Sequence, residues 1–190
     1  MGDTPPEPPK PDTEAFVDLG LPSGTLWATC NVGANAPEEV GGYFAWGETS
    51  PKTHFATDNY EHYAGGNWKN IGSNIAGTQY DAATANWGSE WCMPTADQLS
   101  ELASKCSRKS YTLNGVNGIL FTGPNGNTIF IPNGGRDYEL GHGPYEPDNC
   151  GLWSSSACYT STAYRAWEWS YISYSYRHQG FPIRPVRAKM

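Results

Sequence analysis

Residues 150–186 read CGLWSSSACYTSTAYRAWEWSYISYSYRHQGFPIRPV, and the rest of the chain is organised around this C-terminal tail. The ends of the tail, 152–156 and 180–186, are stiff, while its centre is dominated by Tyr, Ser, Thr, Trp and Arg. Tyrosine and tryptophan give a contact surface large rigid area, serine and threonine add adaptable hydrogen bonds, and arginine adds an anchoring charge. We therefore predict that the tail presents a contact face.

The composition of the 190-residue chain fits one loop-rich, strand-rich domain. It has 22 glycines and 15 prolines but only 16% charged residues, which favours such a globule over a helical bundle or a disordered chain. The net charge of −7 argues against binding nucleic-acid phosphates or anionic lipid, because both need a basic face. No apolar run approaches the roughly 20 residues needed to cross a bilayer.

The N-terminal residues differ from the rest of the chain. Residues 3–14 read DTPPEPPKPDTE, a proline-rich acidic stretch that is typical of an extended spacer. We assign residues 1–14 to a flexible spacer and residues 15–190 to one domain, with 150–186 as its variable-looking segment. No export signal is visible, and the spacer suits either a surface protein tethered at its N-terminus or a plain flexible end.

Two helices are predicted from local signals. Thr95 and Gln98 form a capping box ahead of apolar residues at helical spacing, namely Leu99, Leu102, Ala103 and Cys106. Three basic residues suit the C-terminus of this helix: Lys105, Arg108 and Lys109. Residues 81–86 predict a shorter helix that is capped by Asp81 and ended by the Trp-Gly pair at 87–88.

Strands are predicted on both sides of these helices. Residues 16–30 read as two strands around a Pro-Ser-Gly turn, and 118–122 with 127–131 read as a hairpin around Pro-Asn-Gly. Alternation over 167–172 predicts one strand with a buried face, and Ile183 and Val186 close the chain on a last strand. Between the first strands and the helices, residues 49–80 predict a long surface excursion that packs on itself or serves a purpose.

Four motifs, in order along the chain, carry a resemblance to a known family. They are FVDLGLPSGTLWA at 16–28, WG at 87–88 with WCMPT at 91–95, LWSSS at 152–156 and GFPIRPV at 180–186. With them the chain resembles a bacterial surface-domain family that is abundant in gut Bacteroidetes and related to the Fibrobacter major paralogous domain. Cys92 is a departure, because the family usually has arginine there. The resemblance implies an α+β domain with a C-type-lectin-like fold, as in formylglycine-generating enzymes: one or two helices on a small twisted antiparallel sheet with long loops.

The tail also resembles the variable region of C-type-lectin-like proteins that are diversified by retroelements. Such elements mutate adenines, mostly in asparagine codons, near the C-terminus of the target. Asparagine is frequent before position 150 and absent after it, and the residue types at 158–162 and 171–178 are all reachable from an asparagine codon by changing adenines. An ordinary glycan- or protein-binding surface domain with a Ser/Tyr-rich strand edge would have the same composition, so both interpretations stay open.

Catalytic patterns are absent from the sequence. A glycosidase needs two carboxylates about 5 to 10 Å apart, and spacing singles out no pair among Glu48, Glu90, Asp137, Glu146 and Asp148. A Ser or Cys nucleophile needs a histidine partner, and no nucleophile motif accompanies His54, His62, His142 or His178. We therefore predict a protein that is not an enzyme and needs no cofactor.

Cysteines and one acidic turn raise two alternatives. Formylglycine-generating enzymes depend on a close pair of cysteines that load copper, and Cys150 and Cys158 are near enough in sequence to pair or to bridge; the other three cysteines, Cys30, Cys92 and Cys106, suit buried thiols. Residues 146–149, Glu-Pro-Asp-Asn, resemble a calcium motif of lectins and offer oxygen ligands. A further Trp-Asn-Asp group is missing from the tail, so we favour a plain acidic turn and predict no metal site.

The aromatic residues divide into core and surface. Motif or alternation places seven tryptophans in the core: Trp27, Trp46, Trp87, Trp91, Trp153, Trp167 and Trp169. Four tyrosines among Ser, Thr or Arg are predicted to be exposed: Tyr159, Tyr164, Tyr174 and Tyr176. The predicted ligand contacts are Tyr159, Thr160, Thr162, Tyr164, Arg165, Ser170, Ile172, Tyr174, Tyr176, Arg177 and His178.

These patterns and resemblances together predict a non-enzymatic ligand-binding protein on a bacterial cell surface or a phage particle. Its partner would be a protein or glycan on another cell or host surface. Contact with nucleic acid is not expected, and contact with a membrane is expected through an N-terminal lipid tether at most. A plain adhesin domain and an enzyme related to formylglycine-generating proteins are the alternatives.

Overall fold

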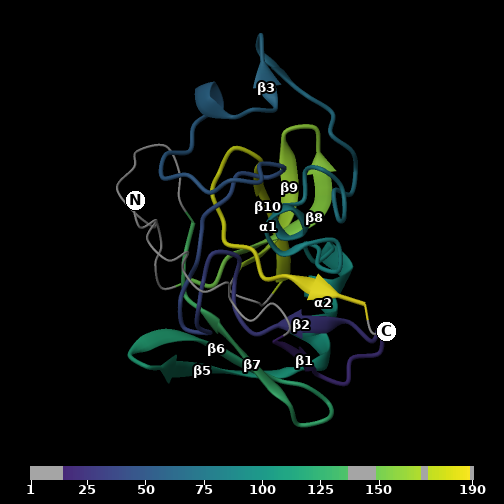
Figure 1. The fold of residues 1–190 in the computed structure, drawn as a ribbon, viewed down its shortest axis with the longest axis vertical. Helices are drawn as coiled ribbons and strands as arrows, with labels where there is room; N and C mark the ends of the chain where they lie inside the picture. Colours follow the sequence, from purple (N-terminus) through teal and green to yellow (C-terminus); the bar gives the residue numbers. More distant parts are fainter. Residues whose placement is uncertain (1–14, 137–148, 168–170, 189–190) are drawn as a thin grey trace, which may run out of the picture.

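The computed structural model describes residues 15–136, 149–167 and 171–188, and it is a small α+β protein with several antiparallel sheets (Figure 1). The first and last strands of the described chain share one sheet. Strands β1 (Phe16–Asp18) and β11 (Val186–Arg187) flank β2 (Leu26–Ala28), and all pairs are antiparallel. The turn after β1 is closed by the bond from Gly24 N to Leu21 O at 2.9 Å, as predicted for the Pro-Ser-Gly turn.

Both predicted helices form where their caps place them. Helix α1 (Ala82–Trp87) begins after Asp81, whose carboxylate accepts from Ala83 N and Thr84 N, and ends at Gly88. Helix α2 (Ala96–Lys105) begins after Thr95 with the capping box to Gln98, and it buries Leu99 and Leu102. Short-range hydrogen bonds set these starts, which is why the sequence suffices to predict them.

The basic residues after α2 are a correction to the prediction. Lys105 lies in the last turn, but Arg108 and Lys109 lie beyond the helix on strand β5 (Ser107–Leu113). Arg108 still reaches back, because its Nη1 donates to the carbonyl of Ala103 at 2.9 Å. A basic side chain can therefore satisfy a helix C-terminus from outside the helix.

A three-stranded antiparallel sheet forms the end of the molecule drawn at the bottom of Figure 1. Strands β5, β6 (Val116–Thr122) and β7 (Thr128–Pro132) pair in that order. The predicted β6–β7 hairpin is confirmed. The β5–β6 turn uses Asn114 and Gly115 at positive φ, 48° and 84°, which an Asn-Gly pair tolerates.

The tail forms a further three-stranded sheet, in the order β10-β9-β8. Its strands are β8 (Leu152–Tyr159), β9 (Thr162–Trp167) and β10 (Tyr171–Tyr176). The prediction of one strand over 167–172 is wrong, because Tyr171 pairs with Trp167 and the chain reverses between them. Alternation of side chains on both sides of a tight reversal looks the same as alternation along one strand.

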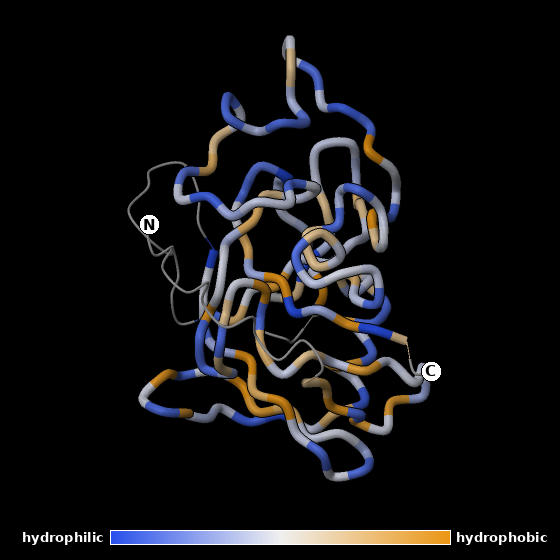
Figure 2. Tube along the Cα trace, viewed as in Figure 1, coloured by the Kyte–Doolittle hydropathy of each residue, from blue (hydrophilic) through white to orange (hydrophobic). Residues whose placement is uncertain are grey.

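The excursion at 49–80 projects from the opposite end of the molecule, at the top of Figure 1, and it is mostly hydrophilic (Figure 2). It contains a 3-10 turn η1 (Thr57–Asn59) and the short strands β3 (Tyr63–Ala64) and β4 (Asn67–Trp68). A satellite core anchors it, with Phe55 and Tyr60 buried beside Ala45. Gly180 allows this packing, because a Cβ there would lie 2.5 Å from the ring of Phe55.

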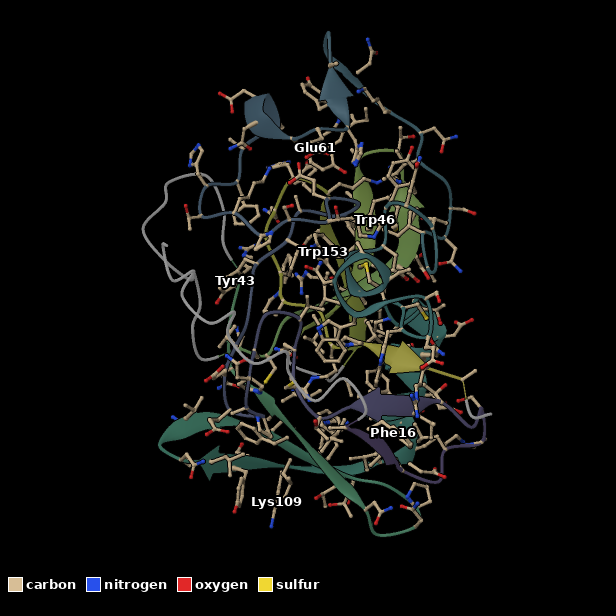
Figure 3. All side chains as sticks on the ribbon, viewed as in Figure 1. Phe16, Tyr43, Trp46, Glu61, Lys109 and Trp153 are labelled. Atoms are coloured by element: carbon tan, nitrogen blue, oxygen red, sulfur yellow. The ribbon has the colours of Figure 1, made fainter. Side chains whose placement is uncertain are left out.

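Two larger cores fill the molecule. The lower core joins the β1-β2-β11 sheet and α2, and the upper core packs Trp46 and Trp153 near Phe181. The indole of Trp46 donates to Ser154 O at 2.9 Å, and that of Trp153 donates to Phe44 O at 2.7 Å (Figure 3). These bonds satisfy the polar edge of each buried ring.

Four of the tryptophans predicted as core are buried: Trp27, Trp46, Trp91 and Trp153. Trp87 is half-buried and meets Trp91 edge to face, with ring centroids 5.2 Å apart. The side chains of Trp167 and Trp169 lie outside the described residues. The same holds for the spacer at 1–14.

The Cys150–Cys158 bridge that the sequence left open does not form, since both residues are free thiols. Cys150 lies just before β8 and Cys158 near its far end. Because an extended strand rises about 3.3 Å per residue, the strand holds the two thiols too far apart to bond. Cys150 instead contacts Asn133 Oδ1 at 2.8 Å. Of the three predicted buried thiols, Cys30 and Cys106 are buried and Cys92 is half-buried.

Candidate functional site

The register of the tail sheet places the predicted contact tyrosines on one face. Tyr174 lies opposite Tyr164, and Tyr176 lies opposite Thr162 on the neighbouring strand. Tyr159 of the third strand also pairs with Thr162, next to an irregularity in β8. Residues opposite each other in a sheet point to the same side, so these side chains share a face. We call Tyr159, Tyr164, Tyr174 and Tyr176 the tyrosine strip.

Helix α2 covers one half of this face and leaves the other half open. Leu152, Ala166 and Ile172 lie on the covered half, where they pack with Leu99 and Leu102 in the lower core. Beyond the helix, Tyr159 is 68% exposed, and Tyr174 and Tyr176 are each 54% exposed. Tyr164 is half-buried. Alternation along the strands predicts the same burial over the whole of this face. The face is exposed where helix α2 no longer covers it.

The strip is continuous with aromatic residues of the excursion. The rings of Tyr159 and Tyr174 meet edge to face at 6.1 Å, and Tyr176 stacks on His178 at 5.8 Å. His178 in turn lies 5.9 Å from Trp68, and Trp68 lies 5.0 Å from Tyr63. Trp68 and Tyr63 escaped the sequence analysis of the site, although the excursion has the Tyr, Asn and Gly content that such surfaces use.

Among the predicted contacts, Thr162 and Arg165 are buried and Ile172 is half-buried. Arg165 is 8% exposed and points to the other face, where its Nε donates to Ser175 Oγ at 2.5 Å and its guanidinium lies over Phe181. Thr162 is buried at the base of the strip, and Ile172 packs against the lower core. Their positions remove them from the contact set that we propose. Ser170 lies outside the described residues.

Arg177 and His178 support the strip from below. Arg177 is 3% exposed, and it donates from Nη2 to Tyr159 O at 2.9 Å and from Nε to Thr162 O at 3.3 Å. Its guanidinium lies 4.3 Å from the ring centroid of Trp46. Arg177 therefore ties the β8–β9 turn to the upper core. His178, 6% exposed, fills the space between Tyr176 and Trp68.

A hollow of about 460 Å³ opens beside Tyr159. One wall is the β8–β9 turn, with Cys158 and Thr160, and the other is the excursion at Asn70, Gly72 and Ser73. Both walls are fixed by backbone bonds, because Ala157 N donates to Ser73 O at 2.8 Å and Ile75 N donates to Ser155 O at 3.0 Å. The excursion thereby covers the outer edge of β8.

Burial and hydrogen bonding shift several pKa values near the site. Burial raises the pKa of the Tyr60 hydroxyl far above its ordinary value, and this hydroxyl donates to Trp46 O at 2.6 Å. A hydrogen bond with Cys158 raises the pKa of Tyr164. Both phenols are therefore neutral at physiological pH.

Of the candidate catalytic carboxylates, the structure describes two, Glu48 and Glu90, and each belongs to a different part of the chain. Glu48 is buried and holds Lys52 Nζ at 2.8 Å and Glu61 N at 3.0 Å, as part of the excursion's base. Glu90 is exposed and lies 3.7 Å from Nη1 of Arg187. Asp137, Glu146 and Asp148 lie outside the described residues, as does the calcium-like turn at 146–149 except for Asn149.

Among the histidines, His54 is exposed, and His62 is buried with Nε2 2.9 Å from Gly47 O. His142 lies outside the described residues. Within the described ranges, no three His, Cys, Asp or Glu side chains gather as a metal site would require. Over the same ranges, no helix has the length and apolar character to cross a membrane.

The strip, its supports and the adjoining hollow therefore form the candidate site, a surface that offers rings, hydroxyls and amides around one deep guanidinium. No family model, curated protein or solved structure matches this chain.

Proposed function

We propose that this chain is a non-enzymatic ligand-binding protein whose tyrosine strip is the contact surface. The observation that carries the proposal is the exposure of Tyr159, Tyr174 and Tyr176 on one face of one sheet. Aromatic rings of this size are normally buried, and a cluster of them in solvent marks a binding surface. The polar neighbours Thr160, Asn70 and Ser73 add hydrogen-bonding capacity beside the rings.

The proposal extends to the fold and the origin of the surface. We propose a C-type-lectin-like fold, supported by two helices and small antiparallel sheets joined by a long excursion. We further propose that a retroelement diversifies the tail, in a protein displayed on a bacterial cell or a phage. Support comes from the separation of roles: Arg177 and Ser154 fix the backbone of the tail sheet, while the tyrosines above it do not hold the core together. A plain adhesin domain with a fixed surface is the alternative.

Comparison of the gene with its flanking DNA tests the diversification. A nearby near-copy of the codons for 150–186 that differs only at adenines, beside a reverse-transcriptase gene, is the expected result. If the flanking DNA holds no near-copy of these codons, the alternative of a plain adhesin domain with a fixed surface is favoured.

Binding itself is tested on a glycan array and on whole bacterial cells, with the Tyr174→Ala/Tyr176→Ala double variant. The variant should keep the wild-type free energy of unfolding to within about 1 kcal/mol, because both rings are more than half exposed, and it should lose retention. Tyr111→Ala, an exposed tyrosine on β5, is the matched control and should be retained. Unchanged retention of the double variant would refute the strip as the contact surface. Retention that chelators abolish would instead indicate a calcium-dependent lectin.

A further inference from the structure

The hollow beside the tyrosine strip has an unusual floor. Arg177 lines it, and two of the three guanidinium nitrogens are used by Tyr159 O and Thr162 O. The third, Nη1, has no partner within the described part of the chain, and no carboxylate there forms an ion pair with Arg177. Arg177 is nevertheless buried, with only 3% of its surface exposed to solvent.

Burying a guanidinium without a counter-charge is energetically unfavourable, and this cost lowers its pKa. Burial lowers the pKa of Arg177, and the partner that opposes this shift is Tyr60, a neutral phenol. Nearby Glu48 binds Lys52, not Arg177. Proteins usually pair such a charge or give it to a ligand. Here the arginine lines an open hollow.

The walls of the hollow decide what kind of anion fits. Its backbone groups at Ala157, Arg177 and Ser73 are already hydrogen-bonded, so the hollow offers no free strand edge to a peptide backbone. What remains are the side chains of Asn70, Ser73 and Thr160 and the exposed ring of Tyr159. The planar guanidinium of Arg177 suits a carboxylate. The hydroxyls and the amide suit a ligand that carries several hydroxyl groups, and the ring of Tyr159 suits the apolar face of such a ligand. The volume is within the range of about 300–1,000 Å³ that small-molecule sites occupy.

We propose that the hollow is a subsite for an acidic monosaccharide, with its carboxylate on Arg177 Nη1 and its ring face on Tyr159. This inference rests on the proposed function, because it names the ligand class that the same surface takes. A terminal sugar acid of a larger glycan would enter the hollow while the rest of the glycan lies along the tyrosine strip.

The test is a titration followed by amide NMR with two probes that differ in one group. Methyl β-glucuronide carries the carboxylate, and methyl β-glucoside carries a CH₂OH in its place. The glucuronide should shift the amide signals of Cys158, Tyr159 and Thr160, and it should bind at least about tenfold more tightly than the glucoside. Equal binding of the two probes, no shift, or shifts confined to other parts of the molecule would overturn the proposal.

Ser73→Asp is the decisive variant, because Arg177→Gln also removes the supports of the β8–β9 turn and can disturb folding. Ser73 is exposed and lines the hollow, so an aspartate there supplies the missing counter-charge and should reduce glucuronide binding at least about tenfold. Ser107→Asp, on exposed β5, is the charge-matched control and should bind as the wild type does. Full binding by Ser73→Asp would refute the role of Arg177.

A third probe separates a sugar from a protein ligand. N-acetylaspartate amide presents a carboxylate without a sugar ring, and binding as tight as that of the glucuronide would overturn the sugar assignment. Failure of all three probes would leave the gene comparison and the Tyr174→Ala/Tyr176→Ala test unaffected, so the subsite and the proposed function fail separately.

Discussion

Arg184 is a charged residue held completely inside the protein, in the GFPIRPV segment at the end of the tail. Its guanidinium donates to Asn31 Oδ1 at 2.7 Å and to the carbonyls of Ala28 and Phe130 at 3.0 Å each. Burial lowers its pKa to about 10. The bonds join the β1-β2-β11 sheet to β7, so the arginine acts as a polar tie between two parts of the lower half.

Replacing Arg184 with methionine should lower the free energy of unfolding by about 2–4 kcal/mol. Three buried acceptors lose their donor, and we expect this loss to outweigh the gain from no longer burying a charge. Urea unfolding measures the change. Lys109→Met, on an exposed strand, is the control and should stay within about 0.5 kcal/mol. A methionine variant as stable as the wild type would mean that the charge costs as much as its hydrogen bonds contribute.

The thiol of Cys106 makes stability depend on alkaline pH. Burial raises its pKa from 9.0 to about 11, so the folded protein keeps the proton between these values while the unfolded chain releases it. The stabilisation is present below pH 9 and is lost as the pH rises to 11. The loss should be on the order of 1 kcal/mol at pH 10, and thermal melts at pH 8 and pH 10 measure it. In Cys106→Ala the drop between the two pH values should be smaller by about that amount. If the loss of stability between pH 8 and pH 10 were unchanged, other groups would cause it. One such group is half-buried Cys92, whose pKa burial also raises to about 11.

At the scale of elements, the start of α1 depends on one carboxylate. Asp81 is fully buried and accepts from four backbone nitrogens: Gly77 N, Ala83 N, Thr84 N and Met93 N, at 2.8, 2.8, 3.1 and 2.9 Å. Thr95 at the start of α2 accepts from Gln98 N alone. Asp81 therefore joins the helix to the segments before and after it, whereas Thr95 serves its own helix.

Asp81→Ala should accordingly cost about 3 kcal/mol, against about 1 kcal/mol for Thr95→Ala, since the aspartate leaves four backbone donors without their acceptor, those of Ala83 and Met93 buried, and the threonine leaves one. Urea unfolding of the two single variants gives the comparison. Equal costs would show that the bonds to Gly77 and Met93 contribute nothing beyond ordinary capping.

The elements that sequence reasoning recovers are those with short-range signals. The two helix caps, the Pro-Ser-Gly turn and the β6–β7 hairpin all follow from residues a few positions apart. Strand β5 was missed because its residues, SRKSYTL, are almost all exposed and carry no apolar alternation. The reversal between Trp167 and Tyr171 was missed because period-2 alternation continues through both strands.

The site follows the same division at the scale of the whole molecule. Exposure of Tyr159, Tyr174 and Tyr176 was predicted from their polar neighbours and is confirmed. Burial of Arg165 could not be predicted, because sheet register decides which face it takes. Trp68 reaches the strip across more than a hundred residues of sequence, through His178, and a contact of that range leaves no local pattern.

Trp68 gives the last prediction, because it links a marginal excursion to the rigid half of the protein. It contacts Tyr60, Tyr63 and His178 from a two-stranded hairpin, which is too small to be stable alone. Trp68→Ala should leave the global free energy of unfolding within about 1 kcal/mol but raise trypsin cleavage after the exposed Lys69 about fivefold or more. Tyr111→Ala, an aromatic truncation at the opposite end, should leave that cleavage rate unchanged. If Trp68→Ala instead lowered global stability and cleavage elsewhere in parallel, the excursion would unfold together with the core, and the wall of the hollow at Asn70–Ser73 would be as rigid as the sheet beside it.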